Sequence, residues 1–347
     1  MNSSSVSVAI VTFNSAEVIA KCLQYVFEQD YPNLRVIVVD NASSDRTPDI
    51  VEQFRSRVSF IRNRENIGFA AGQNQAIAQS NSDWVLTLNP DVRLAPDFLT
   101  KGISAGERDA QIGSVSGKVL RMGSTFEIPT RRILDSTGIY FTPALRHFDR
   151  GSGEADSGQY DQPEYVFGVT GAAALYRRKM IEDVSVDGQF FDEDFFAYRE
   201  DADLSWRAQL LGWKCLYAPD AVAYHVRKVL PSNRAALPAI INMHSVKNRF
   251  LMRVKNITPS LYARHFLPTT ARDLLVFGGC LLREFSSLRA FSLVVKLFPK
   301  MLTRRKQIVT RRRVGEQYML AWFSNRPVSR SATDVSATPS ATAVTTR

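Results

Sequence analysis

Apolar and polar residues follow two different periods along the first quarter of the chain. A continuous, β-rich apolar segment predicts a buried strand at 6–13, and a second buried strand is predicted at 35–40. A short third strand is predicted at 58–62 and a fourth at 84–88. The segments between them carry apolar residues at helical spacing, as in 69–79. Strands joined by helices of this length indicate parallel βαβ units. The pattern therefore predicts an α/β fold, with a mostly parallel sheet and helices on both faces.

The rest of the chain shows three further patterns. Short strand-like segments rich in Gly, Ser and Thr fill 111–176, and helical spacing runs from Asp201 to Leu211. From about Pro238 the sequence is basic and amphipathic, whereas 324–347 lacks any periodicity. We expect three regions: an α/β domain over 1–225, a basic helical region over 226–323 and a disordered tail over 324–347.

Charge is distributed unevenly between these regions. Residues 1–225 contain 22 Lys+Arg and 30 Asp+Glu, whereas residues 226–322 contain 19 and 3. An acidic first domain is not typical of a nucleic-acid-binding protein. The basic region is expected to face phosphates or other acidic groups.

Cysteine usage and hydropathy indicate the compartment. Cys22, Cys215 and Cys280 lie far apart in the sequence, which excludes a disulfide scaffold and a zinc finger and fits a reducing environment. We find no secretory signal and no apolar segment of roughly 20 residues. We therefore expect a protein on the cytoplasmic side of the membrane.

Polar residues follow the predicted strands. In an open parallel sheet, ligands bind outside the carboxyl ends of the strands. The turn after the first strand lacks the glycines of a dinucleotide motif, and there is no P-loop. A divalent cation on Asp91 could neutralise a phosphate instead, although Asn-Pro-Asp is also ordinary turn chemistry. The polar strand ends are Thr12, Phe13 and Asn14, then Asp40, then Asn89 and Asp91.

Seven motifs occur in an order that resembles family 2 glycosyltransferases, and more narrowly the bacterial rhamnosyltransferase-like branch that builds surface polysaccharides. They are VAIVTFN, VIVVDNASSD, RENIGFAAGQNQAI, LTLNPDV, GAAALYRR, FFDEDFFAYREDADLSWRAQLLGW and AVAYHV. The resemblance covers residues 6 to about 225 and extends weakly to Lys255-Asn256. It implies a GT-A fold, a nucleotide-sugar donor, a divalent cation (Mg²⁺ or Mn²⁺) and inversion at the anomeric carbon.

The resemblance also implies roles for individual residues. Asp91 would bind the metal, and His225 would complete that site, unless it is a strand-end histidine satisfied by backbone. Asn89 replaces the first acid of the family's Asp-x-Asp motif, so it would contact sugar or ribose. The other residues beside the donor would be Thr12, Phe13, Asn14, Asp40, Asn66, Gly68 and Asn74.

Three acids open the helix predicted after residue 200. Carboxylates in a first helical turn are favoured by the helix dipole, so Glu200, Asp201 and Asp203 could simply cap it. Three acids in four positions exceed what a cap requires. The resemblance places the general base in the first two; we choose Asp201 and keep Glu200 as the alternative.

The basic helical region is expected to associate with a membrane. Basic amphipathic helices lie in membrane interfaces, and the clusters at 304–306 and 311–313 suit anionic lipids. The competing interpretation is a helical core that packs on the first domain. We expect peripheral attachment to the inner face of the cytoplasmic membrane, near a lipid-linked acceptor.

The sequence thus predicts an inverting, metal-dependent glycosyltransferase. It would move a sugar, with rhamnose indicated by the branch, from a nucleoside-diphosphate donor to a glycan or lipid-linked acceptor in bacterial surface polysaccharide synthesis. One alternative is another nucleotide-using α/β transferase, such as a nucleotidyltransferase, but its Gly/Lys/Arg-rich N-terminal signature is missing. The other is a nucleic-acid-binding protein using the basic region. We expect no nucleic-acid partner, because we find no helix-turn-helix and no aromatic–arginine platform.

Overall fold

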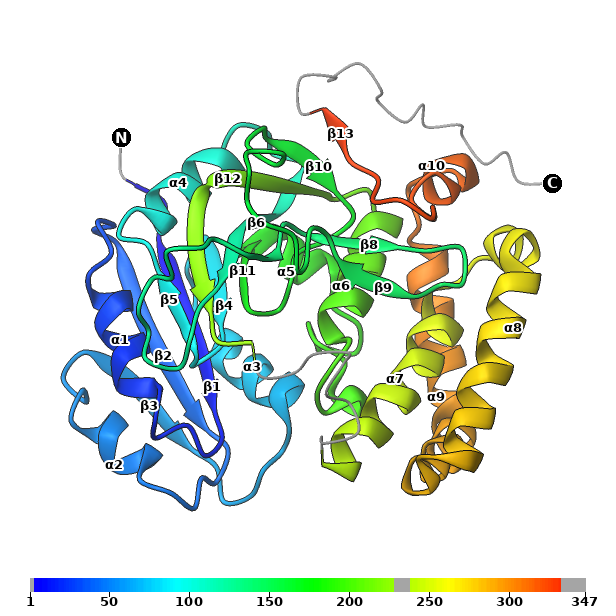
Figure 1. Ribbon diagram of the computed structural model, residues 1–347, viewed down its shortest axis with the longest axis horizontal. Helices are drawn as coiled ribbons and strands as arrows, with labels where there is room; N and C mark the ends of the chain where they lie inside the picture. The colour runs from blue at the N-terminus through cyan, green and yellow to red at the C-terminus, as the bar shows by residue number, and fades with distance from the viewer. Residues whose placement is uncertain (1–2, 228–237, 332–347) are drawn as a thin grey trace.

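A computed structural model describes residues 3–227 and 238–331. Its largest feature is a mixed sheet with strand order β13-β10-β12-β6-β11-β4-β1-β2-β3 (Figure 1). The first four strands pair in parallel, and their predicted positions are confirmed to within about one residue. They are β1 (Val6–Thr12), β2 (Leu34–Asp40), β3 (Val58–Arg62) and β4 (Trp84–Leu88).

Helices cover both faces of the sheet, as predicted. Along β1, Val8 and Ile10 belong to one apolar core and Ala9 and Val11 to another, which explains why these strands are apolar without alternation. The helices of this part are α1 (Ile19–Phe27), α2 (Thr47–Glu52), α3 (Phe69–Ala78), α4 (Phe98–Gly106), α5 (Arg178–Val184) and α6 (Glu200–Leu210).

The second half of the sheet is partly antiparallel. β11 (Ala173–Arg177) lies antiparallel between β4 and β6 (Ile112–Arg121). The two closing strands expected at 214–217 and 221–225 form one strand, β12 (Lys214–His225), which is parallel to β6 and irregular between Ala218 and Val222. The shorter strands are β5 (Val92–Leu94), β7 (Leu134–Ser136), β8 (Ile139–Phe141), β9 (His147–Asp149) and β10 (Glu164–Val166).

The basic region forms helices that share a core with the sheet. Leu251, Met301, Ile308 and Phe323 belong to the same apolar cluster as Val11. Figure 1 shows α7 between α6 and the outermost helix α8. The elements are α7 (Ala239–Asn256), α8 (Pro259–Leu282), η3 (Phe285–Leu288), α9 (Arg289–Thr310), α10 (Glu316–Leu320) and β13 (Arg330–Ser331).

The two basic clusters are engaged within the protein. Arg304 is buried and pairs with Asp192 and with Asp194, the latter at 3.0 Å. Arg311 and Arg313 both pair with Asp183, and Arg312 pairs with Glu316. The expectation that the basic clusters face anionic lipid is therefore wrong for the buried Arg304. Arg311, Arg312 and Arg313 pair with acids of the protein but remain partly exposed, and their contact with lipid stays a prediction.

The last described residues are ordered against the sheet. Tyr165 and Arg330 are paired partners of β10 and β13, so the described chain extends beyond the start of the tail expected at 324. The rest of that predicted tail, 332–347, lies outside the described residues.

Candidate active site

Two cavities meet at the carboxyl edge of the parallel strands. The first, of about 280 Å³, lies over the end of β1, and the second, of about 530 Å³, lies toward α6. Phe69, Asn89 and Asp91 line both. A ligand in the first cavity can therefore reach into the second past Asp91.

Asp91 and His225 face each other at this junction. Asp91 immediately precedes β5, which pairs antiparallel with the end of β12, so His225 lies opposite Val92. The N–H of Val226 donates to the carbonyl of Asp91 at 3.1 Å. His225 Nε2 lies 3.4 Å from Oδ1 of Asp91. The fold thus brings together the two side chains that the resemblance implies as metal ligands.

Asp135 fixes the orientation of the His225 ring. Its Oδ2 lies 2.8 Å from His225 Nδ1, and Arg227 lies 3.0 Å from its other oxygen. Burial alone would raise the pKa of Asp135, but these two partners lower it. A carboxylate on one ring nitrogen directs the other toward the cavity, which is the usual arrangement around a metal-binding histidine.

Two side chains fit a cation site that is completed by a ligand. Within the described ranges, no group of three or more His, Cys, Asp or Glu residues is placed to hold a metal ion. Mg²⁺ is commonly held by one or two protein groups, with phosphate and water supplying the rest. The oxygen of Asp91 and the nitrogen of His225 fit such a site.

Two carboxyl groups at the start of α6 line the second cavity. Asp201 accepts hydrogen bonds from the N–H of Gly171 at 3.0 Å and from that of Ala202 at 2.7 Å. Burial and the charge of Asp149 raise the pKa of Asp201 to about 6 despite these bonds. Oε2 of the buried Glu200 has no hydrogen-bond partner among the described residues. Burial and Asp201 raise the pKa of Glu200 further, so Asp201 is the carboxyl more readily ionised.

Helix α7 holds the segment that leads into these acids. Tyr198 and Arg199 have left-handed φ angles of 71° and 70°, which cost free energy for residues other than glycine. The side-chain amide of Asn248 donates to the carbonyls of Phe195, Ala197 and Tyr198 at 2.9, 2.8 and 2.7 Å. Asn248 of α7 therefore holds the backbone just before α6 and positions the start of that helix.

A family model described as glycosyl transferase family 2 matches residues 7–185, more than half of the chain. The chain belongs to glycosyl transferase family 2. This match favours glycosyl transfer over the nucleotidyltransferase alternative. It ends before the basic region, so nucleic-acid binding by that region is not tested by it.

Curated relatives of this glycosyltransferase carry several activities. An N-acetylglucosaminyl-diphospho-decaprenol L-rhamnosyltransferase from Mycobacterium tuberculosis is 27% identical, over 55% of this chain and 66% of its own length. An N-acetylglucosaminyltransferase from Rhizobium meliloti is 29% identical, over 62% of this chain and 50% of its own length. The chain thus matches two thirds or less of these relatives.

Solved structures confirm the GT-A fold. A mannosyltransferase from Pyrobaculum calidifontis, solved with GDP-Man and Mn²⁺, superimposes with a TM-score of 0.53 at 18% identity, over 90% of this chain and 86% of that chain. Residues 1–349 of TarS from S. aureus give a TM-score of 0.52 at 17% identity, over 88% of each chain.

The predicted nucleotide-binding residues of the glycosyltransferase occupy different positions. Phe13, Asn14 and Asn89 line the first cavity. Thr12 and Asp40 are both buried beneath it, and the Thr12 hydroxyl donates to Asp40 at 2.9 Å. These last two therefore support the strand ends, and their contact with a nucleoside stays a prediction.

Asn66, Gly68 and Asn74 join α3 to the segment before α6. Asn66 accepts a hydrogen bond from the N–H of Gly68 at 2.9 Å. Gly68 has a φ of 91°, and a Cβ there would lie 2.6 Å from Phe196, so only glycine fits. Asn74 exchanges hydrogen bonds of 2.8 and 2.9 Å with the backbone of Phe191. None of the three is among the described residues lining the two cavities, and their role toward the donor stays a prediction.

The third acid of the cluster, Asp203, belongs to the core. It is fully buried and pairs with Arg207 at 3.1 Å and Lys255 at 2.7 Å. Arg207 and the buried Trp206 thus have the structural roles of pairing and packing. The role of Asp203 is therefore structural, and it adds no carboxylate to the second cavity.

Besides Arg199, which lies inside the sixth quoted motif, sequence reasoning missed three charged residues of the second cavity. Asp135, Asp149 and Arg227 line it, and Arg227 bridges the two acids at 3.0 and 2.8 Å. The acids come from β7 and β9, which no clear pattern predicted. Arg227 directly follows the motif AVAYHV, and that adjacency is the signal that could have found it.

Proposed function

We propose that this protein is an inverting, metal-dependent glycosyltransferase that uses a nucleoside-diphosphate sugar. The observation that carries the proposal is the shared cavity of Asp91, His225 and Asp201. One side of that cavity has groups suited to a leaving diphosphate, and the other has a carboxylate suited to an attacking hydroxyl.

The donor would lie across the junction of the two cavities. Phe13 is 51% exposed at the first cavity and offers an apolar surface to a base or ribose, and Asn14 offers a polar group. Asp91 and His225 would hold the divalent cation, Mg²⁺ or Mn²⁺. When bound, the cation supplies Lewis-acid stabilisation to the leaving diphosphate.

Asp201 would act as the general base. Its two N–H partners favour the ionised carboxylate and fix its direction. As the acceptor oxygen forms its bond to the anomeric carbon, the bond from that carbon to the diphosphate oxygen breaks, and the acceptor proton passes to Asp201. Attack opposite the leaving group inverts the configuration, and no second carboxylate is needed as nucleophile.

The acceptor would be a glycan or a lipid-linked saccharide of the bacterial cell envelope. The name of the mycobacterial relative supports this, because it specifies a saccharide carried on diphospho-decaprenol and rhamnose as the sugar transferred. We therefore take rhamnose as the first donor sugar to test. No described helix is long and apolar enough to cross a membrane.

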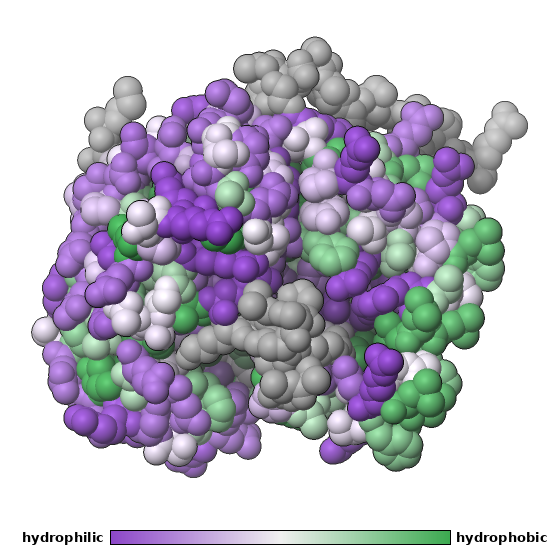
Figure 2. All heavy atoms as spheres, viewed as in Figure 1, coloured by the Kyte–Doolittle hydropathy of each residue, from purple (hydrophilic) through white to green (hydrophobic). Residues whose placement is uncertain are grey.

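Peripheral attachment to the inner face of the cytoplasmic membrane is part of the proposal. Figure 2 shows apolar surface on the side where Figure 1 places α8. Leu274, Leu275, Leu282 and Phe285 are each at least two thirds exposed. Apolar side chains of this size on a basic helical region are typical of interfacial binding.

Calorimetry with a panel of nucleoside-diphosphate sugars, with and without Mn²⁺, tests the function. We expect one donor to bind with metal dependence and to release its nucleoside diphosphate when acceptor is added. Asp91→Ala should remove the metal dependence, and His225→Ala should weaken it less. Equal affinity with and without metal in the unmodified protein would contradict the proposed metal site.

A further inference from the structure

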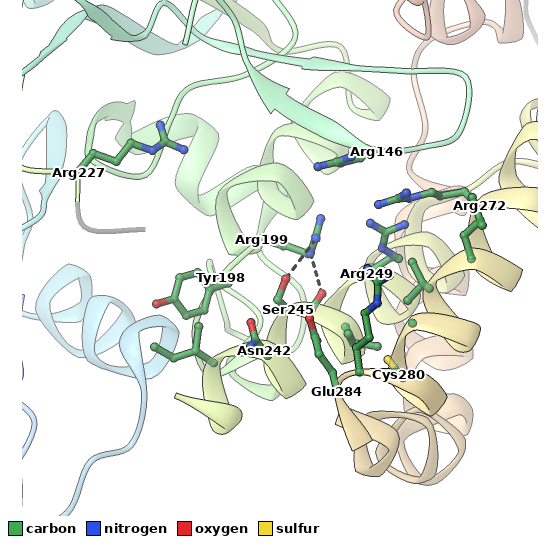
Figure 3. A pocket seen from close by; sticks show the side chains of 16 residues that line it. Arg146, Tyr198, Arg199, Arg227, Asn242, Ser245, Arg249, Arg272, Cys280 and Glu284 are labelled. Carbon is green, nitrogen blue, oxygen red and sulfur yellow. Dashed lines mark hydrogen bonds between the residues drawn. The ribbon is translucent and has the colours of Figure 1, made fainter. Parts of the chain in front are cut away.

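A third cavity, of about 480 Å³, lies between α7, α8 and the hairpin of β8 and β9. It adjoins the second cavity. Tyr198, Arg199, Arg227 and Ser245 line both cavities, so the third one opens directly beside the acids of α6. Figure 3 shows Arg199 at this boundary, hydrogen-bonded to Ser245.

The lining of the third cavity is strongly basic. Among the described residues it contains six arginines and a single acid, Glu284. The arginines come from separate parts of the chain: Arg146 from the β8–β9 hairpin, Arg199 and Arg227 from the catalytic side, Arg249 from α7, and Arg272 and Arg283 from α8 and its end. Figure 3 shows Arg146, Arg249 and Arg272 directing their side chains toward one another.

Two of these arginines have unused hydrogen-bonding capacity. Arg249 is only 6% exposed, and within the described ranges its Nη1 has no hydrogen-bond partner. Nε of Arg272 also has no hydrogen-bond partner among the described residues. Burying a guanidinium with an unsatisfied donor is costly unless something else supplies an acceptor.

The neighbouring charges do not offset the cost of burying the positive charge of Arg249. Burial and the positive charges of Arg199, Arg253 and Arg272 lower its pKa to about 8. The acid that acts on it most, Asp273, is already paired with Arg253 at 2.7 Å. Although Arg227 is paired with Asp135 and Asp149, the other arginines of the lining still outnumber its one acid, Glu284. Such a site is suited to a ligand that carries more than one negative charge.

We propose that the third cavity binds the diphosphate of a lipid-linked acceptor. The guanidinium fork matches the oxygens of a phosphate. The donor's own diphosphate belongs at Asp91 under the proposed function, on which this inference rests, so an anion here comes with the acceptor. The shared boundary at Arg199 would then place the acceptor's sugar beside Asp201.

The apolar walls of the third cavity fit the lipid chain of such an acceptor. Leu275 and Val276 of α8 line it, and Leu274, Leu281 and Leu282 continue the apolar surface at 67%, 47% and 85% exposure. A diphosphate among the arginines would leave its lipid chain along this face of α8. That direction leads from the catalytic cavity to the apolar surface expected at the membrane.

Binding of farnesyl diphosphate by calorimetry in EDTA tests the site without any need for transfer. EDTA removes metal-dependent binding at Asp91, and Asp91→Ala should leave the affinity unchanged. We expect the double variant Arg249→Gln with Arg272→Gln to bind at least tenfold more weakly. Arg264→Gln is the matched control, because Arg264 is exposed on α8 and does not line the cavity.

Each outcome has a stated meaning. Inorganic pyrophosphate should bind more weakly than farnesyl diphosphate; equal affinity would overturn the lipid-linked acceptor and leave only an anion site. Loss of binding to phosphatidylglycerol vesicles in the double variant, with farnesyl diphosphate binding intact, would assign the arginines to lipid headgroups. If the folded double variant binds farnesyl diphosphate as tightly as the unmodified protein does, the inference is wrong. If the unmodified protein binds farnesyl diphosphate but transfers no sugar, only the proposed function is contradicted.

Arg272→Gln alone is the second variant should the double variant unfold. Arg272 is partly exposed, so its loss leaves the core intact. We expect it to weaken farnesyl diphosphate binding severalfold, and an unchanged affinity would count against the site.

Discussion

Nδ1 of His225 lies 2.8 Å from Oδ2 of Asp135. This contact gives the histidine a fixed ring orientation, with Nε2 directed toward Asp91 at the junction of the two cavities. Asp135 itself is 1% exposed and is also held by Arg227 at 3.0 Å. We therefore regard it as a positioning residue for the proposed metal site.

Asp135→Asn should weaken Mn²⁺-dependent binding of the nucleoside diphosphate about 10- to 100-fold, because partners of this kind tune ligand orientation and basicity. Calorimetry measures the effect, and metal-independent binding serves as the internal control. A variant that binds metal and nucleotide like the unmodified protein would show that His225 needs no orientation by Asp135.

The proposed base should show its pKa in the pH profile of catalysis. A base acts when it is ionised, so kcat/KM should be level above the pKa of Asp201, about 6, and should fall as pH drops below it. The measurement is kcat/KM from about pH 5 to 8 at saturating metal. A profile that stays level down to pH 5 would argue against a buried carboxylate as base.

Glu200→Gln should stabilise the fold at neutral and higher pH. A carboxyl whose pKa is raised by folding destabilises the folded state as pH rises from about 4.5 toward about 8. Glutamine mimics the protonated acid, so the variant should gain at least about 1 kcal/mol at pH 8 and little at pH 4. Urea unfolding at both pH values measures this. Loss of transfer in this variant, with Asp201→Asn still active, would move the base to Glu200.

Arg304→Ala should destabilise the whole protein by about 3–5 kcal/mol, as expected when one partner of a buried ion pair is removed. Arg304 is 2% exposed and joins α9 to Asp192 and Asp194. Lys306→Ala is the matched control, because Lys306 is exposed two residues away. Unfolding followed by circular dichroism should remain a single transition, since both regions share one core. A variant as stable as the control would contradict the structural role of Arg304.

The sequence predicted the first half of the fold closely, and for a physical reason. β1, β2 and β4 are buried on both faces over most of their length, so their apolar segments are unambiguous, whereas β3 is a partly buried edge strand. Parallel strands bring Asn14 and Asp91 to one edge. The sequence could not reveal Asp135, because its place depends on the pairing of β7 with β6 and on Arg227. Short antiparallel pairings of this kind leave no periodic signal.

The basic region shows that net charge alone does not reveal which arginines are paired within the protein. The sequence predicts an acidic first domain and a basic helical region, and it assigns the excess positive charge to anionic lipid. The structure satisfies part of it internally, since Asp183 takes both Arg311 and Arg313. The arginines left in the third cavity, Arg249 and Arg272 among them, could not be distinguished from the paired ones by sequence alone.

The central claim is that Asp201 accepts the proton of the acceptor hydroxyl, while other residues of the site bind the nucleotide-sugar donor. The most direct test is the rate of sugar transfer by Asp201→Asn at a donor concentration that calorimetry shows to be saturating. We predict a 10²- to 10⁴-fold loss of rate with donor affinity nearly unchanged. A rate close to that of the unmodified protein would contradict the account, because no proton would then be passing through Asp201.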